Sequence, residues 1–341
     1  MITTVSLSIG AGTSILLYIW VVLIGGHGDV AGAVAVGGLI ALLLALGIGL
    51  YFAQLVARRV RRIEEAARKV ADGDFAARIP VDSSGQLGRL ARTFNEMQRR
   101  LAELDSARKQ FIANASHELR TPIFSLGGFI ELLDEEDPSP EERAEFVRTM
   151  RQQIERLTKL TGDLLNLSQL DAGGIEMAIG SVDLSSLARD VAREFGARAE
   201  LRGSRLELRT PDRAVIAVAD PDRVRQIIRI LLDNALTHTP EGASVTVTIY
   251  SVNQRAELTV SDDGTGIPQR VQKRIFERFY TADSAGGSGL GLAIARELVQ
   301  RMDGHIAISS SRRFTAFTLD LPLAPPGAPA PARPDAAKVT A

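Results

Sequence analysis

The spacing of hydrophobic residues changes several times along this chain of 341 residues. Two apolar runs come first, at residues 5–24 and 30–56, and each reaches the roughly 20 residues that a helix needs to cross a bilayer. Four arginines follow within residues 58–62, so the positive-inside rule places both ends in the cytoplasm. The pattern predicts a hairpin of two transmembrane helices over residues 1–56. A cleaved signal peptide is the alternative for the first run, although no basic residue precedes it.

Helical periodicity continues beyond the second apolar run. Apolar residues at positions 56, 60, 63, 67 and 70 form one stripe of a helix, which should stop at the glycine within residues 71–75. A second helical stripe covers residues 87–104. We therefore expect residues 57–105 to form a linker of two helices joined by a turn and an extended segment. An ordinary helical hairpin is the alternative.

A stronger helical pattern begins at Ile112. From there to Leu133, the seam positions recur at alternating spacings of four and three, which is typical of a helix bundle, and all are hydrophobic except Ser116. Its phase differs by one residue from that of the preceding helix, so one straight supercoil cannot satisfy both. A second amphipathic helix is predicted over residues 141–171. Because two such helices leave apolar surface in water, we expect residues 106–171 to form a four-helix bundle in a homodimer.

The periodicity becomes mixed after the glycine pair at residues 173–174. The order of elements predicts an α/β domain at residues 172–323, a sandwich with helices layered on one face of a sheet. Residues 324–341 are rich in proline and alanine and are predicted to be a disordered tail. The expected helices begin near residue 183 and cover 222–237 and 290–302, and the expected strands lie near 214–218, 245–250, 257–260, 305–310 and 314–321.

Composition narrows the classes of function. The formal net charge is -1, so no basic surface argues for a nucleic-acid partner. The chain has no cysteine, which excludes disulfides, thiolate catalysis and cysteine-ligated zinc. The candidate chemistry therefore lies in a histidine and in motifs rich in aspartate, asparagine and glycine.

His117 lies one residue off the bundle seam, so its imidazole should face water on the flank of the bundle. Thr121 is one turn further along the same face, Glu118 is adjacent, and Pro122 should kink or loosen the helix. A neutral imidazole has a free lone pair near neutral pH, and Glu118 can accept the proton of the other ring nitrogen. By itself, however, an exposed histidine on a helix is usually ordinary surface.

Three motifs in the last domain suit a nucleotide. Asn234, in the helical segment LLDNA, can present a neutral oxygen to Mg²⁺ that bridges phosphates. Asp262 follows an apolar strand, and two glycines after it let the backbone approach a flat base. A third glycine-rich segment opens a helix, where backbone N–H groups suit phosphates. The glycines concerned are Gly264, Gly266, Gly287, Gly289 and Gly291.

These motifs together resemble those of a known family. Residues 117–122, HELRTP, are similar to the H-E-x-x-T/N-P phospho-acceptor box of sensor histidine kinases. The three nucleotide motifs resemble the ATP-binding fold that these kinases share with gyrase-type topoisomerases, ninety-kilodalton heat-shock chaperones and mismatch-repair ATPases. Residues 57–105 resemble the HAMP signal-relay module.

The resemblance implies a multidomain sensor kinase of a two-component system, multi-pass in the inner (plasma) membrane with cytoplasmic catalytic domains. ATP would phosphorylate His117, and the phosphate would pass to an aspartate of a response regulator. Asn234 would hold Mg²⁺, Asp262 would bind adenine, and the glycines would surround the base and phosphates. In the family, the residue at the Thr121 position is associated with dephosphorylation of the regulator.

Some positions differ from the family pattern. Thr237 replaces a basic residue, residues 280–286 form a short segment without the usual arginine, and the last glycine motif is missing, so that Arg312 and Arg313 are alternative phosphate contacts. Ile230 stands where chaperone-type enzymes carry the glutamate that activates water, which disfavours the alternative of a hydrolytic ATPase or clamp. A weakly catalytic or non-catalytic dimeric signalling scaffold is the other alternative.

Overall fold

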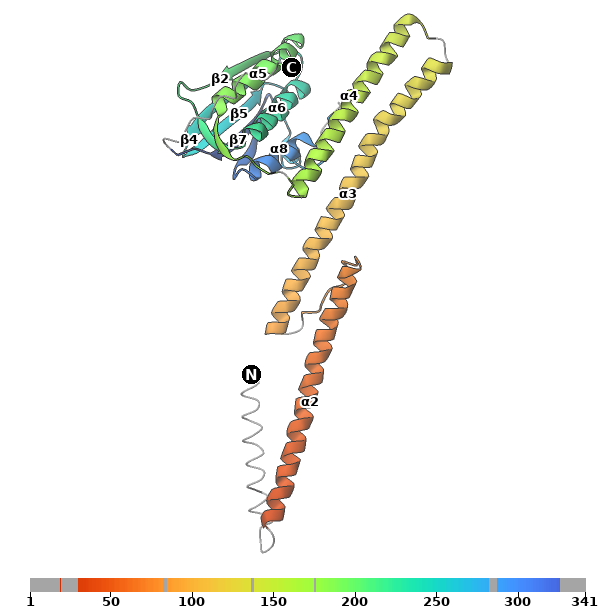
Figure 1. Ribbon diagram of the computed structural model, residues 1–341, viewed down its shortest axis with the longest axis vertical. Helices are drawn as coiled ribbons and strands as arrows, with labels where there is room; N and C mark the ends of the chain where they lie inside the picture. The colour runs from red at the N-terminus through yellow and green to blue at the C-terminus, as the bar shows by residue number, and fades with distance from the viewer. Residues whose placement is uncertain are drawn as a thin grey trace, which may run out of the picture. The chain divides into compact units, whose positions relative to one another are not determined.

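The computed structural model falls into two compact units, Met1–Lys109 and Gln110–Ala341, which Figure 1 traces along the chain. The predicted first membrane span lies outside the described residues except for Ile19, and so does the predicted tail beyond residue 325. The structure describes residues 19, 30–81, 85–135, 138–174, 176–281 and 287–325.

The first unit contains the long helix α2, Val30–Ala71. Within the described residues, α2 is the one helix long and apolar enough to cross a membrane, and its most apolar window has a mean hydropathy of 2.4. Its leucines are exposed, for example Leu42 at 65 % and Leu43 at 58 %, so this apolar surface is not part of a protein core. Arg68 and Lys69 lie in the last turn, where positive charge favours the helix dipole.

The linker after α2 has the predicted turn and extended segment. Gly73 adopts a φ of +87°, which glycine tolerates without the steric cost that a side chain brings. The extended segment is fixed by Asn95, whose side chain accepts from the Ile79 N–H at 3.0 Å and donates to its carbonyl oxygen at 2.9 Å. Gln98 donates to the Phe75 carbonyl oxygen at 2.7 Å. These amides anchor the segment in a way that hydrophobic periodicity does not predict.

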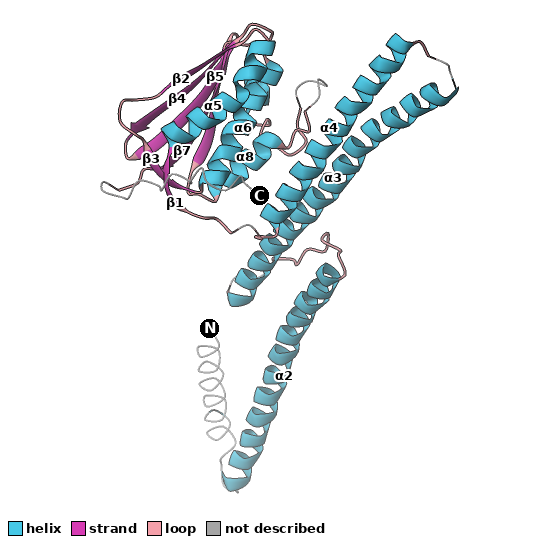
Figure 2. Cartoon of the chain, turned by 45° about the horizontal axis from the view of Figure 1, so that its top comes forward, coloured by secondary structure: helices cyan, strands magenta, loops and turns pink. Residues whose placement is uncertain are grey.

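Helix α3 comprises Gln86–Glu135 and α4 comprises Pro140–Asp171. The α3 backbone stays helical where the seam changes phase and also through Pro122, which lacks the N–H that would bond the Glu118 carbonyl oxygen. At the start of α4, Ser139 and Glu142 form a reciprocal capping box. Figure 1 and Figure 2 both show α3 and α4 side by side.

The seam of these two helices remains open in the single chain. Phe129 and Phe146 join α3 to α4 with ring centroids 5.5 Å apart. By contrast, Ile123, Ile130 and Ile154 are 57 %, 55 % and 53 % exposed. A hairpin with this much apolar surface requires a further partner for its seam, as the sequence predicts.

The α/β domain has a five-stranded sheet in the order β2-β4-β5-β7-β6. The β2–β4 pair is parallel, and the other pairs are antiparallel. A separate two-stranded sheet joins β1 to β3. The strands are β1 Gly180–Asp183, β2 Arg205–Arg209, β3 Ile216–Ala219, β4 Ser244–Val252, β5 Arg255–Asp262, β6 His305–Ser311 and β7 Phe314–Pro322.

Three longer helices lie on one face of the large sheet, as Figure 2 shows. They are α5 Leu184–Leu201, α6 Pro221–His238 and α8 Gly291–Gln300, and a short helix α7 covers Gln269–Gln272. Side chains from all three helices and the inner face of the sheet form one core, in which Leu231, Ile294 and Leu258 are fully buried. The predicted α/β layering is therefore confirmed. Hydrophobic periodicity did not predict β1, β2 and α7, each of five residues or fewer.

Candidate active site

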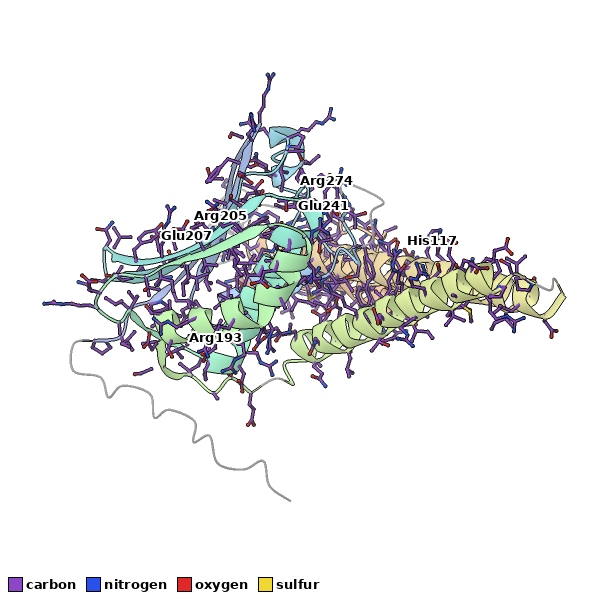
Figure 3. All side chains as sticks on the ribbon, turned by 90° about the horizontal axis from the view of Figure 1, so that it is seen from above. His117, Arg193, Arg205, Glu207, Glu241 and Arg274 are labelled. Atoms are coloured by element: carbon purple, nitrogen blue, oxygen red, sulfur yellow. The ribbon has the colours of Figure 1, made fainter. Side chains whose placement is uncertain are left out.

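The imidazole of His117 is exposed on α3, as predicted, and Figure 3 labels its position. The neighbouring Glu118 is half-buried and forms an ion pair with Arg156 of α4, with Nη2 and Oε2 3.4 Å apart. The candidate proton acceptor thus has a cationic partner on the second helix, which the sequence analysis missed.

Thr121 is exposed, but its hydroxyl has a local partner. Its Oγ1 donates to the carbonyl oxygen of His117 at 3.4 Å. Threonines in helices often make this bond to the preceding turn. The bond is long, so a rotation of the side chain suffices to direct the hydroxyl toward a docked partner.

Asn234 lies on α6, a helix that begins with a strong cap. The Asp220 side chain accepts from the N–H groups of Asp222 and Arg223 at 2.9 and 3.1 Å, and proline occupies the first turn. Asn234 is half-buried, and no hydrogen bond joins its amide to another part of the chain that the structure describes. Its side-chain oxygen is therefore available to a ligand.

Asp233, next to Asn234, is tied to two other helices. It pairs with Lys159 of α4 and with Arg198 of α5, whose Nη1 lies 2.5 Å from Oδ1. Burial raises the pKa of this carboxyl, but the hydrogen bonds and charges of the two cations outweigh burial and leave the pKa below its usual value. Arg198 also donates to the Thr237 hydroxyl at 3.0 Å. Arg198 of α5 thus provides a positive charge beside Thr237, which stands where the family pattern has a basic residue.

Asp262 is the last buried position of β5, in line with Leu258 and Val260. It is 8 % exposed, and its Oδ1 accepts from the Gly264 N–H at 3.0 Å. Burial raises the pKa of this carboxyl, the Gly264 bond opposes that effect, and the charge of Asp263 adds to it. Among the described residues, the second carboxylate oxygen has no hydrogen-bond donor, so it can accept one from a ligand.

The protein's own packing requires the glycines after Asp262. A Cβ at Gly264 would lie 2.8 Å from both Asp262 Oδ1 and Thr239 Cγ2. Gly266 has a φ of +74°, and a Cβ there would lie 1.6 Å from the Ser311 carbonyl oxygen. The turn after β5 is therefore held between α6 and the β6–β7 turn, which carries Arg312 and Arg313.

The third glycine segment lies against α6 and the residues before it. Gly289 has a φ of +64°, and a Cβ there would lie 2.6 Å from the Phe279 backbone. A Cβ at Gly291 would lie 3.3 Å from Ile230, and one at Gly287 would lie 3.9 Å from Nε2 of His238. Helix α8 begins here without a side-chain cap, so its first N–H groups are available to an anion.

The end of α6 therefore brings the three nucleotide motifs together. Thr239 contacts the Asp262–Gly264 turn, and His238 lies beside Gly287. Asn234 is four residues before His238, on the same helix face. The arrangement can place a base at Asp262 and phosphates between Asn234 and the start of α8.

The α/β domain is also attached to the helical hairpin. Arg278 makes two hydrogen bonds to the Asp171 carboxylate at 2.6 and 2.7 Å, and the rings of Phe279 and Phe111 lie 5.5 Å apart. Ser288, within the third glycine segment, donates to Asp163 of α4 at 3.0 Å. Burial raises the pKa of the Asp163 carboxyl. Hydrophobic periodicity predicts none of these attachments, because they join residues far apart in sequence.

Among the described residues, no three His, Cys, Asp or Glu side chains lie close enough together to hold a metal ion. Mg²⁺ needs no such cluster at a nucleotide, because it binds phosphates and water with one or two protein oxygens. The available amide oxygen of Asn234 fits that requirement.

Comparisons with known families give matches in three consecutive parts of the chain. Residues 51–103 match the HAMP domain. Residues 107–173 match the His Kinase A (phospho-acceptor) domain. Residues 219–325 match the histidine kinase-, DNA gyrase B- and HSP90-like ATPase family. The last match contains all three nucleotide motifs, so this domain has an ATP-binding fold.

Curated proteins show the same similarity over longer stretches. The chain is 34 % identical over 270 residues to the signal transduction histidine-protein kinase BaeS of Escherichia coli (strain K12), covering 77 % of this chain and 57 % of that protein. It is 36 % identical over 288 residues to the signal transduction histidine-protein kinase/phosphatase MprB of Mycolicibacterium smegmatis (strain ATCC 700084 / mc(2)155), covering 79 % of this chain and 57 % of that protein. The chain thus spans little more than half the length of these relatives.

A solved structure shares the fold. The histidine kinase ThkA, in its complex with the response regulator protein TrrA, matches with a TM-score of 0.57 and 23 % identity, over 67 % of this chain and 66 % of that chain. The hairpin and the α/β domain are thus a known combination.

Proposed function

Because this chain belongs to the two-component sensor histidine kinases, we propose that it transfers the γ-phosphoryl group of ATP to His117 and then to an aspartate of a response regulator. The observation that carries the proposal is the meeting of the Asn234, Asp262 and Gly287 segments at the end of α6, in a chain whose α3 presents an exposed histidine.

In the proposed reaction, the lone pair of one His117 ring nitrogen attacks the γ-phosphorus. The new N–P bond forms as the bond from phosphorus to the β–γ bridging oxygen breaks, and ADP leaves with that electron pair. The proton on the other ring nitrogen passes to Glu118, which must first leave its ion pair with Arg156. Most of the catalysis is positioning and charge neutralisation, because phosphoryl transfer needs little else from the protein.

The nucleotide site follows from the same geometry. Asp262 accepts a hydrogen bond from the exocyclic amine of adenine through its open carboxylate oxygen. The uncapped start of α8 binds phosphates after Gly287, Gly289 and Gly291. Mg²⁺, bound by the Asn234 oxygen, would neutralise part of the phosphate charge.

The domain arrangement is proposed as residues 1–56 in the membrane, 57–105 as HAMP linker, 106–171 as phospho-acceptor hairpin, 172–323 as ATP-binding domain and 324–341 as tail. The HAMP match and the apolar helix α2 indicate a membrane location, and we place two spans there with the catalytic parts in the cytoplasm. The exposed seam of the hairpin supports a homodimer. The ThkA–TrrA complex supports docking of a regulator.

Dephosphorylation of the regulator is the second proposed activity. The relative MprB is a histidine-protein kinase/phosphatase by name, and Thr121 shares a helix face with His117. Once its hydroxyl leaves the His117 carbonyl oxygen, it can orient a water toward an aspartyl phosphate.

The function is tested by incubating the full chain, reconstituted in lipid nanodiscs, with γ-labelled ATP and Mg²⁺. Acid-labile label is expected on the wild type and is expected to be absent from His117→Ala, while ATP binding persists. Binding of ATP without any label would favour the scaffold alternative. A hydrolytic ATPase is disfavoured because Ile230, packed against the core and beside Gly291, offers no general base.

A further inference from the structure

A cavity of about 240 Å³ lies between the helical hairpin and the third glycine segment. Its lining comprises Glu118 from α3, Ser288 from the glycine segment, and five residues of α4, namely Gln152, Glu155, Arg156, Lys159 and Leu160. The volume is several times the ~30 Å³ that one water occupies in the liquid, so a phosphoryl group fits. The cavity therefore connects the proposed phosphate site with the residue next to His117.

The two cations that line this cavity have carboxylate partners on different elements. Arg156 pairs with Glu118 at 3.4 Å, a distance beyond that of a strong charge-assisted bond. Lys159 pairs with Asp233 of α6, and its own side chain is 61 % exposed. Either cation can exchange its carboxylate for another anion, because a partly exposed ion pair contributes at most about 1 kcal/mol to stability.

We infer that Arg156 and Lys159 bind the γ-phosphoryl group of ATP inside this cavity while it passes to His117. The inference rests on the proposed function and adds two catalytic side chains to it. The planar guanidinium of Arg156 offers two parallel donors that match the oxygens of a phosphoryl group. Lys159 adds a second positive charge one turn away, on the same face of α4.

This binding also explains the ion pair between Arg156 and Glu118. When the γ-phosphoryl group reaches Arg156, the guanidinium exchanges its carboxylate partner for phosphoryl oxygens. Glu118 is then free to accept the proton that leaves the other ring nitrogen as the N–P bond forms and ADP departs. The arrival of the phosphoryl group thus prepares the base that the transfer needs. The inferred route runs from the glycine segment to the hairpin of the same chain, so it predicts transfer within a chain.

The test measures the first-order rate of His117 labelling at saturating ATP in the reconstituted full chain. Arg156→Gln and Lys159→Gln are each expected to lower that rate about 10- to 100-fold, less than the loss of a fully enclosed donor in an oxyanion site. ATP affinity should stay as in the wild type, and Arg156→Lys should retain part of the rate. The matched control is Arg151→Gln, an exposed arginine on α4 that does not line the cavity and should label normally.

The sign of the Arg156 result separates this role from a structural one. If Arg156 only restrained Glu118, its removal would free the base and raise the labelling rate, and that result would overturn the inference. An equal loss in ATP affinity and rate would do the same, because it would indicate damage to the nucleotide site. Should Arg156→Gln fail to fold, Lys159→Gln carries the test, since its side chain is largely exposed.

Labelling of the wild-type chain distinguishes a wrong role for Arg156 and Lys159 from a wrong assignment of kinase activity. A wild-type chain without acid-labile label at His117 would refute the kinase itself. A wild-type chain that labels normally, with Arg156→Gln and Lys159→Gln variants that match it, would leave the kinase in place and remove the two cations from the reaction.

Discussion

Replacing Asp262 by Asn should weaken ATP binding and strengthen the fold at the same time. The carboxylate is 8 % exposed, and its open oxygen is proposed to accept from the adenine amine. A hydrogen bond to a charged acceptor contributes about 1.5–3 kcal/mol, and the amide of an asparagine replaces only part of it. Loss of the whole hydrogen bond would raise the Kd for ATP about 10- to 150-fold, and this is the upper limit expected for the variant.

The effect on stability has the opposite sign. Burial raises the pKa of Asp262, so the folded state holds this proton more tightly than the unfolded state does. The cost of the buried charge is then fully present above the raised pKa, and it decreases as the pH falls through that pKa. Asp262→Asn removes the cost, so the variant should be more stable near neutral pH, and the gain should shrink toward acid.

The assay combines calorimetric ATP titration with denaturant unfolding at several pH values. The control is Asp263→Asn, which changes the neighbouring exposed carboxylate; its Oδ1 accepts a hydrogen bond from the Ser244 N–H at 2.7 Å. This control variant should be less stable than the wild type and should bind ATP with unchanged affinity. Asp262→Asn with unchanged ATP affinity and lower stability would refute both the adenine contact and the origin of the pKa shift.

Three other changes test separate parts of the account. Gly266→Ala should lower folding stability by at least ~1–2 kcal/mol, because an alanine at this positive φ is strained and its Cβ would meet backbone. The control Gly180→Ala, with open space around it, should be nearly neutral, and thermal unfolding measures both variants. Thr121→Ala should lower dephosphorylation of the regulator much more than labelling; equal losses would indicate a damaged helix. Mixed dimers of His117→Ala and Asn234→Ala chains should stay unlabelled if transfer is within one chain, and label in them would contradict the cavity route.

Periodicity was enough to predict the long helices and the main strands. The seam from Ile112 to Leu133 predicts α3 because one side of that helix must be apolar over many turns. Strand β2, RLELR, alternates leucine with charged residues over only five positions, so its pattern is too short to predict a strand. Its parallel pairing with β4 depends on a distant segment, which no local pattern contains.

The candidate site was predictable where the chemistry is local to a motif. Asn234 lies on a helix and Asp262 at the end of an apolar strand, as their motifs predict, and each has a side-chain oxygen available to a ligand. The ion pairs of Glu118 and Asp233 could not be predicted, because Arg156 and Arg198 come from other helices. The packing requirement for Gly264 and Gly266 could not be predicted either, because a Cβ there would meet Thr239 and Ser311, which are distant in sequence.

The most direct test of the central claim is the chemical identity and position of the phosphate in the full chain. After incubation with γ-labelled ATP and Mg²⁺, the account predicts one acid-labile, base-stable phosphoramidate, mapped to His117 by mass spectrometry, which is lost on adding ADP or an acceptor regulator. Phosphate found on a serine, threonine or aspartate, or label that survives His117→Ala, would contradict it.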